Sequence, residues 1–76
     1  MKKTNLVAEY DELSNNFYID MPPYSSKNKP SKIDHTQQIE SEIGIICLDW
    51  FNGKLCGIEI PNARENVNLG QLNIKS

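Results

Sequence analysis

The side chains best suited to chemistry lie in one short segment of this 76-residue chain. The segment holds two thiols, Cys47 and Cys56, and two carboxylates, Asp49 and Glu59. Two carboxylates can exchange protons with a substrate or hold a cation, and a thiol activated by a histidine can act as a nucleophile. These four residues are therefore the first candidates for an active site.

The sequence lacks the companions that such sites need. A zinc site requires further soft ligands beside the two cysteines, and His35 is the single histidine in the sequence. A calcium loop requires regularly spaced oxygens and a glycine at its bend, which the segment around Asp11, Asn15 and Asn16 does not have. The chain also holds no phosphate loop, dinucleotide fingerprint or nucleophile elbow. We therefore interpret the cysteines as core residues and predict no catalytic residue, no metal and no cofactor.

Length and composition restrict the class of protein. A domain of 76 residues buries only about 60% of its unfolded surface, so we expect one domain over 1–76 without a large cleft. No apolar run approaches the roughly 20 residues of a membrane span, and the N-terminal segment has no apolar core typical of a signal peptide. We therefore expect a cytoplasmic protein with reduced thiols and no contact with membranes.

The charge balance disfavours nucleic acid as a partner. The net charge is −2 and the isoelectric point is about 5.2, whereas phosphate binding requires clustered basic residues. A basic patch would require the N-terminus to approach the lysines of a later loop, and few aromatic residues accompany them. The lysines concerned are Lys2, Lys3, Lys27, Lys29 and Lys32.

The alternation of apolar and polar residues predicts a mainly β fold, a small antiparallel meander of four to five strands. The ranges expected to form strands are 6–10, 16–21, 32–39, 44–50 and 54–60. The polarity of the third range indicates an edge strand, since polar side chains discourage further pairing. Asn52-Gly53 predicts a two-residue hairpin turn, because Asn and Gly accept positive φ.

The connections are expected to be of two kinds. Residues 22–31 hold three prolines with several serines and lysines, which predicts a flexible surface loop where Tyr24 is the only recognition group. Pro61 ends the last strand, and Asn62 is expected to cap at most one short helical turn over 63–67. The tail, 68–76, is expected either to add a short strand or to fray.

A two-residue turn at Asn52-Gly53 fixes the register of the last two strands, with Trp50 facing Leu55 and Leu48 facing Gly57. One face then carries Ile45, Cys47, Asp49, Phe51, Cys56, Ile58 and Ile60. The other carries Ile46, Leu48, Trp50, Leu55, Gly57 and Glu59. Asp49 and Glu59 are thus expected on opposite faces as solvated residues or as partners of Lys54.

Both of these expected faces are apolar, whereas a half-exposed antiparallel sheet should show one polar face. The second face needs a cover, which is either the terminal helical turn and tail folding back or another chain. So short a chain has little material for the first option, and two copies packed as a sandwich would supply the second. Gly57 is expected to leave room for a bulky neighbour such as Trp50 to lie across the strand.

The residues of the two hairpins resemble a known family. The segments "EYDELSNNFYI" at 9–19 and "GIICLDW…GKLCGIEIPNA" at 44–63 are similar to the small bacterial domain-of-unknown-function family 2283. The matching positions are Tyr10, Asp11, Tyr18, Ile19, Gly44, Ile45, Asp49, Gly53, Leu55, Gly57, Ile58, Glu59, Ile60 and Ala63. The resemblance spans about 7–63 and implies a small β-rich fold without an assigned activity.

Two departures from the family pattern affect the predicted geometry. The proline-rich loop is longer than in the family, and the loop of the last hairpin is one residue shorter. A one-residue shift of register would exchange the two faces of the strand concerned.

We predict a non-enzymatic small protein-interaction module of the inhibitor, immunity or counter-defence type that self-associates. Its expected partners are a second copy of itself and/or another protein. The residues expected to bind a partner are Ile46, Leu48, Trp50, Leu55, Tyr18 and Tyr24. The alternative is an oligomer that sequesters a small molecule or nucleotide in a pocket between subunits, lined by Tyr18, Tyr24, Trp50 and the lysine-bearing loop.

Overall fold

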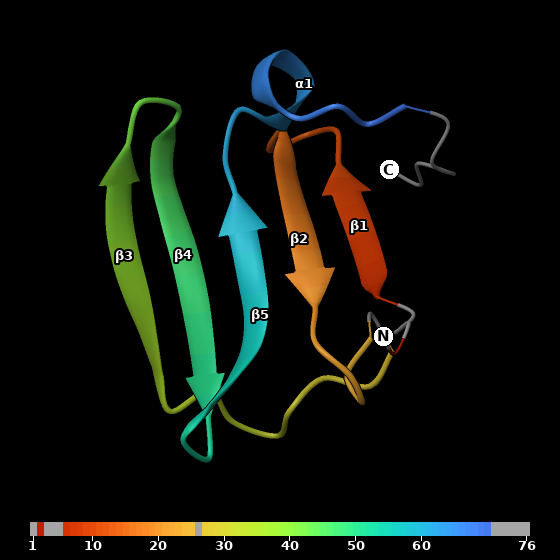
Figure 1. Ribbon diagram of the computed structural model, residues 1–76, viewed down its shortest axis with the longest axis vertical. Helices are drawn as coiled ribbons and strands as arrows, with labels where there is room; N and C mark the ends of the chain where they lie inside the picture. Colours follow the sequence, from red (N-terminus) through yellow and green to blue (C-terminus); the bar gives the residue numbers. More distant parts are fainter. Residues whose placement is uncertain (1, 3–5, 26, 71–76) are drawn as a thin grey trace.

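The computed structural model describes residues 2, 6–25 and 27–70. These residues form one open antiparallel sheet of five strands followed by one short helix (Figure 1). The elements are β1 (Val7–Asp11), β2 (Asn16–Asp20), β3 (His35–Ser41), β4 (Gly44–Phe51), β5 (Lys54–Ile60) and α1 (Ala63–Asn66). The predicted mainly β fold with one short helical turn near the C-terminal end is confirmed.

The strand order is β1-β2-β5-β4-β3. A strictly sequential meander would place β3 beside β2, but β5 pairs with β2 and so separates it from β4 and β3. The connection from β2 therefore runs along one end of the sheet to its far edge (Figure 1). All seven residues of β3 are exposed and the strand pairs only with β4, as expected for a polar edge.

A β-bulge interrupts the hairpin of β4 and β5. The turn itself is as predicted, with φ of 53° at Asn52 and 76° at Gly53. Beyond Trp50, however, Asp49 pairs with Gly57 and leaves Cys56 as an extra residue of β5. The predicted uninterrupted register is therefore wrong, because every pair beyond the bulge is shifted by one residue.

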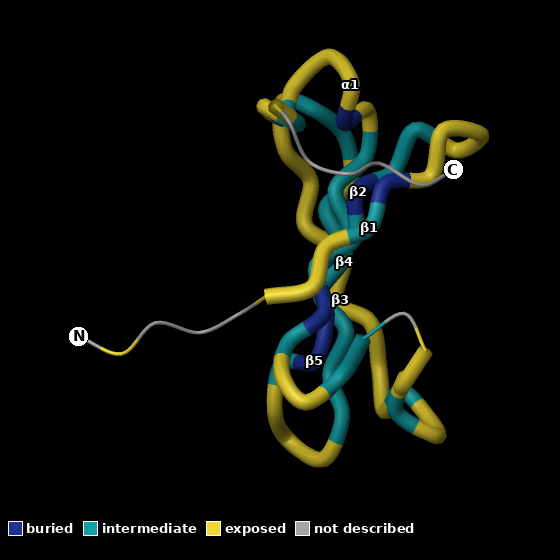
Figure 2. The backbone as a smooth tube through the Cα atoms, turned by 90° about the vertical axis from the view of Figure 1, so that its right-hand side faces the viewer, coloured by how far each residue is buried: buried dark blue, intermediate teal, exposed yellow. Residues whose placement is uncertain are grey.

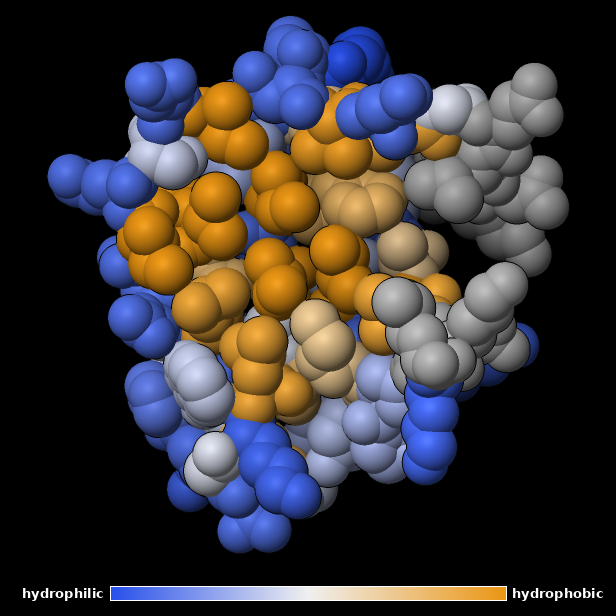
Figure 3. Space-filling view, in the orientation of Figure 1, coloured by the Kyte–Doolittle hydropathy of each residue, from blue (hydrophilic) through white to orange (hydrophobic). Residues whose placement is uncertain are grey.

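The shifted register gives the sheet two chemically different faces. Leu48 now pairs with Ile58, which in turn pairs with Ile19 of β2. The face that these residues share, called here the apolar face, carries Tyr10, Phe17, Ile19, Ile39, Ile46, Leu48, Trp50, Ile58 and Ile60. Figure 3 shows it as a broad, continuous hydrophobic surface.

The opposite face, called here the polar face, carries every charged residue of the five described strands. These residues are Glu9, Asp11, Asp20, Glu40, Asp49, Lys54 and Glu59. The prediction of two apolar faces is therefore wrong, since the bulge moves Ile58 and Ile60 to the side of Leu48 and brings Glu59 to the side of Asp49.

The hydrophobic core is small and lies at one end of the apolar face. Tyr10, Phe17 and Ala63 are buried together, and Val67 and Leu69 pack partly against them. α1 therefore covers only the end of the sheet next to the turn between β1 and β2 (Figures 1 and 2). Most of the remaining apolar face is only partly buried.

Asn15, and not Asn62, caps the helix. The side-chain oxygen of Asn15 accepts a hydrogen bond from the Arg64 amide at 2.9 Å, and its carbonyl accepts one from the Ala63 amide at 3.0 Å. Asn62 makes no side-chain cap and instead donates to the Ile43 carbonyl at 2.7 Å. The predicted Asn62 cap is wrong because Asn62 has a left-handed φ of 50° and its side chain points to another loop. The predicted tail strand falls largely on 71–76, outside the described residues.

Candidate functional site

The polar face holds a hollow of about 410 Å³, within the roughly 300–1,000 Å³ of small-molecule sites. Its walls come from β1, β2, β4, β5 and the loop that leads to β3. The carboxylates that line it are those of Glu9, Asp11, Asp49 and Glu59. The prediction that Asp49 and Glu59 point to opposite faces is therefore wrong, because the bulge brings both to this hollow.

Tyr18 is the centre of a hydrogen-bond network in this hollow. Its hydroxyl donates to Oδ2 of Asp49 at 2.6 Å, although the two residues lie on strands that are separated by β5. Thr36 donates to the other oxygen, Oδ1, at 2.7 Å. Both oxygens of the Asp49 carboxylate are thus held by hydroxyl donors from strands on either side.

Gly57 makes this network possible. A Cβ at this position would overlap the Tyr18 hydroxyl and ring, so the tyrosine crosses β5 only because position 57 has no side chain. The prediction that Gly57 accommodates Trp50 is wrong, since Trp50 lies on the apolar face and stacks on His35. Burial, followed by the hydrogen bond and charge of Asp49, raises the pKa of Tyr18 well above its usual range. The phenol therefore acts as a hydrogen-bond donor.

Lys29 fastens the proline-rich loop to the polar face. Its Nζ lies 2.7 Å from Oδ1 of Asp20 and 3.0 Å from Oε2 of Glu9, and 4.4 Å from the centroid of the Tyr18 ring. Burial lowers the pKa of Lys29, but its hydrogen bonds to Asp20 and Glu9 outweigh that effect and raise the pKa. Asp20 is only 1% exposed, so this ammonium group compensates a buried carboxylate.

The chemistry of the hollow is acidic. Of the groups that line it, Lys29 is the cation, and its ammonium is already paired with two carboxylates. The hollow therefore repels phosphates and other anions. Within the described part of the chain, no group of three or more residues could hold a metal ion.

The cysteines do not have the environment of a nucleophile. Burial raises the pKa of both thiols, and nearby carboxylates raise each pKa further, Glu59 and Asp49 for Cys47 and chiefly Asp49 for Cys56. Cys56 is buried and donates its thiol to the Asp49 carbonyl at 3.3 Å. Both thiols are unpaired, and at neutral pH both are protonated, which makes them poor nucleophiles.

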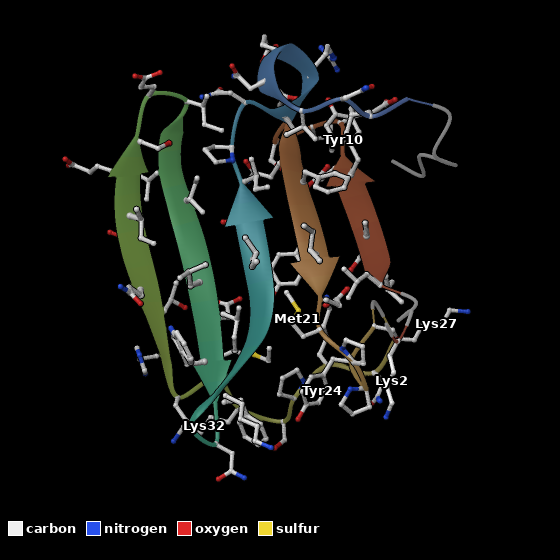
Figure 4. The ribbon with its side chains drawn as sticks, in the orientation of Figure 1. Lys2, Tyr10, Met21, Tyr24, Lys27 and Lys32 are labelled. Carbon is white, nitrogen blue, oxygen red and sulfur yellow. The ribbon has the colours of Figure 1, made fainter. Side chains whose placement is uncertain are left out.

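The residues predicted to bind a partner do not form one surface. Ile46, Leu48 and Trp50 lie on the apolar face, and Leu55 pairs with Trp50 beside the bulge. Tyr18 lies in the hollow on the other face. Tyr24 packs edge-on against Phe51 near the turn of the hairpin, with ring centroids 6.3 Å apart (Figure 4).

Sequence reasoning missed Ile58 and Ile39 as members of the apolar face, and missed the network of Tyr18, Asp49 and Lys29. The sequence did contain a signal for the position of Ile58. Gly57 precedes it inside the strand, and a glycine inside a strand often marks a bulge. A basic patch would require the lysines to lie together, whereas Figure 4 places Lys32 far from Lys2 and Lys27, and Lys29 is engaged in ion pairs. Lys3 lies outside the described residues.

No protein-family model, curated protein or solved structure matches this chain. The resemblance to domain-of-unknown-function family 2283 therefore stays a prediction. None of the helices in the described ranges has the length and apolarity needed to cross a membrane.

Proposed function

We propose that the protein is a non-enzymatic protein-interaction module that binds its partner through the apolar face of the sheet. One observation carries this proposal. Over the strands β3, β4 and β5, no described element forms a second layer on that face (Figure 2). Ile39 is 40% exposed there, and Leu48 and Ile58 are only partly buried.

The physical reason is that a sheet with one apolar face normally buries it against a second layer. Apolar surface that leaves water contributes about 25 cal/mol per Å², and large contiguous apolar patches on soluble proteins are typical of interaction sites. A partner that covers the apolar face would gain this contribution without displacing any charged residue of the described strands.

The inhibitor, immunity or counter-defence type remains the biological class that we propose. A small protein of this kind acts by occupying the surface of another molecule, which requires a binding face and no catalytic group. The apolar face is open and can serve as the binding face. The groups of the polar face are held by internal hydrogen bonds and ion pairs.

The alternative, a small-molecule or nucleotide pocket between subunits, receives less support. Tyr18 and Trp50 lie on opposite faces of the sheet, so they cannot line one pocket in the same chain. The hollow that does contain Tyr18 is lined by carboxylates, which would repel the phosphates of a nucleotide.

Photo-cross-linking in cells tests the proposal. A benzoylphenylalanine placed at position 39, on the apolar face, should yield a defined covalent adduct with whichever chain covers that face. The matched control is position 45, because Ile45 is 46% exposed and lies on the polar face of the neighbouring strand. Adducts from position 45 together with none from position 39 would contradict the proposal.

A further inference from the structure

We infer that the partner of the apolar face is a second copy of this chain, packed face to face as the second layer of a β-sandwich. The inference rests on the proposed function and names the partner. Three features support it: the segregation of charge in the sheet, the area of the apolar face, and the small size of the core.

Because the charged strand residues all lie on the polar face, two copies can pack closely face to face only through the apolar face. Each chain has a net charge of −2, and the carboxylates of the strands all lie on the polar face, as in Asp20, Asp49 and Glu59. Contact between two polar faces would bring these carboxylates together and cost free energy. Contact between two apolar faces buries no charged strand residue and leaves both polar faces in water.

The open part of the apolar face has the area of a small interface. The uncovered strands β3, β4 and β5, about 4.8 Å apart with a rise of about 3.4 Å per residue, present roughly 14 Å by 25 Å, or about 350 Å² in projection. Side-chain relief makes the accessible area larger than the projection. A dimer through this patch would therefore lie toward the lower end of the sizes of specific interfaces.

The core of a single copy is small. Among the described residues, the buried hydrophobic ones are Tyr10, Phe17, Cys56 and Ala63. A core of this size contributes little stability, and many small domains add to it by disulfides, metals or oligomerisation. The two cysteines are free and the described residues offer no metal cluster, so a second copy is the support that the open apolar face favours.

A second copy also matches the shape of the face. Two identical sheets have the same twist, so they pack in the aligned arrangement, with their strand directions about 30° apart and the sheets about 10 Å apart. The contact is isologous, since each copy offers the same side chains about a two-fold axis. Leu48 and Ile58 of each copy, on the inner strands β4 and β5, lie at its centre, and Ile39 on the edge strand lies at its rim.

Light scattering coupled to size exclusion tests the inference on the whole chain. Wild-type protein should elute with twice its mass of 8.7 kDa. Ile39→Lys places an ammonium group on the apolar face and should weaken the dimer about tenfold or more. Ile45→Lys is the matched control. Ile45 is 46% exposed and Ile39 is 40% exposed, but Ile45 lies on the polar face, so this substitution should leave the dimer intact.

Trp50 provides a second readout that does not depend on any variant. It is the single tryptophan of the chain and lies on the apolar face opposite His35. Its fluorescence emission should shift to longer wavelength as wild-type protein is diluted and the dimer separates. Emission that does not depend on concentration, in protein that scatters as a monomer, would overturn the inference.

The remaining outcomes separate this inference from the proposed function. A wild-type monomer that binds a hydrophobic dye, and whose dye binding is lost in Ile39→Lys but kept in Ile45→Lys, has an open apolar face. That result would refute the second copy and leave the interaction module standing. A monomer that binds no dye would refute both. A dimer that survives Ile39→Lys but is lost in Ile45→Lys would place the contact on the polar face and also refute the second copy at the apolar face.

Discussion

The two faces of this sheet are built by opposite means. The polar face is held together by individual polar contacts with defined partners. Tyr18 donates a hydrogen bond to Asp49 across Gly57, and Lys29 forms an ion pair with Asp20, which is 1% exposed. On the apolar face, aliphatic side chains lie in rows with no charged residue between them. The polar face is held by contacts within the chain, whereas we propose that the apolar face is covered by a second molecule. Substitutions should therefore affect the polar face equally at all protein concentrations and the apolar face in a concentration-dependent manner.

The largest effect is expected on the polar face, from Gly57→Ala. The added methyl group would overlap the Tyr18 ring, so the tyrosine must leave and its hydrogen bond to Asp49 is lost. We expect a loss of about 3 kcal/mol in the free energy of unfolding, measured by urea denaturation. In Tyr18→Ala background the same substitution should cost much less. Equal costs in both backgrounds would show that Tyr18 does not depend on Gly57.

A smaller effect on the same face is expected from Lys29→Met. The substitution leaves the Asp20 carboxylate buried without its ammonium partner, although the Lys29 side chain is 44% exposed and water can partly replace it. We expect a loss of about 2 kcal/mol, which is reduced from that of a fully buried pair. Adding Asp20→Asn should recover part of the loss, and a double variant less stable than Lys29→Met alone would argue against the ion pair.

The apolar face should make wild-type stability depend on protein concentration. If unfolding separates two chains, each tenfold rise in concentration should add about 1.4 kcal/mol to the free energy of unfolding. Urea midpoints measured at several concentrations test this dependence. The control is Ile39→Lys, for which the midpoint should vary much less. A wild-type midpoint that stays constant would remove the contrast between the two faces.

The smallest effect concerns the Tyr18 hydroxyl alone. Tyr18→Phe keeps the ring over Gly57 and removes the donor to Asp49, so we expect a loss of about 1 kcal/mol at neutral pH. The effect on pH dependence is more specific. Because the pKa of Tyr18 is raised in the folded protein, the native state retains this proton longer than the unfolded state does. The stabilisation is present below the usual phenol pKa of about 10 and is lost as the pH rises above it.

Denaturation curves recorded from neutral to alkaline pH measure that loss. The wild-type curve should fall more steeply above about pH 10 than the curve of Tyr18→Phe. Parallel curves would mean that another group causes the alkaline loss. Protein concentration should have no influence on the difference between the two proteins, since Tyr18 lies on the polar face.

The local features of the sequence predicted much of the fold. Alternation placed the strands, and Asn52-Gly53 fixed the turn, because both depend on neighbouring residues alone. The strand order was not predictable in this way, since the pairing of β2 with β5 depends on contacts between residues that are distant in the sequence. The same limit applies to Asn15, which caps a helix that begins 48 residues later at Ala63.

The candidate site was predicted poorly for a related reason. Its composition depends on which face Glu59 and Ile58 occupy, and a single extra residue at Cys56 decides that question. The alternation of apolar and polar residues predicts the face of each side chain only where the hydrogen-bonded ladder is regular. Sequence reasoning therefore found the residues of β5, placed Leu55 correctly opposite Trp50, and assigned the residues beyond the bulge to the wrong faces.

The bulge at Cys56 also determines how β5 would respond to a change in its length. Deletion of Cys56 would restore a regular ladder and keep the other pairs, because Asp49 already faces Gly57 and Leu48 already faces Ile58. One residue inserted between Gly57 and Ile58 in an otherwise regular ladder would instead turn Ile58 toward the polar face and Glu59 toward the apolar face. The strand can therefore lose one residue at the bulge and keep both faces of the sheet, whereas a gain of one residue beyond it would exchange them.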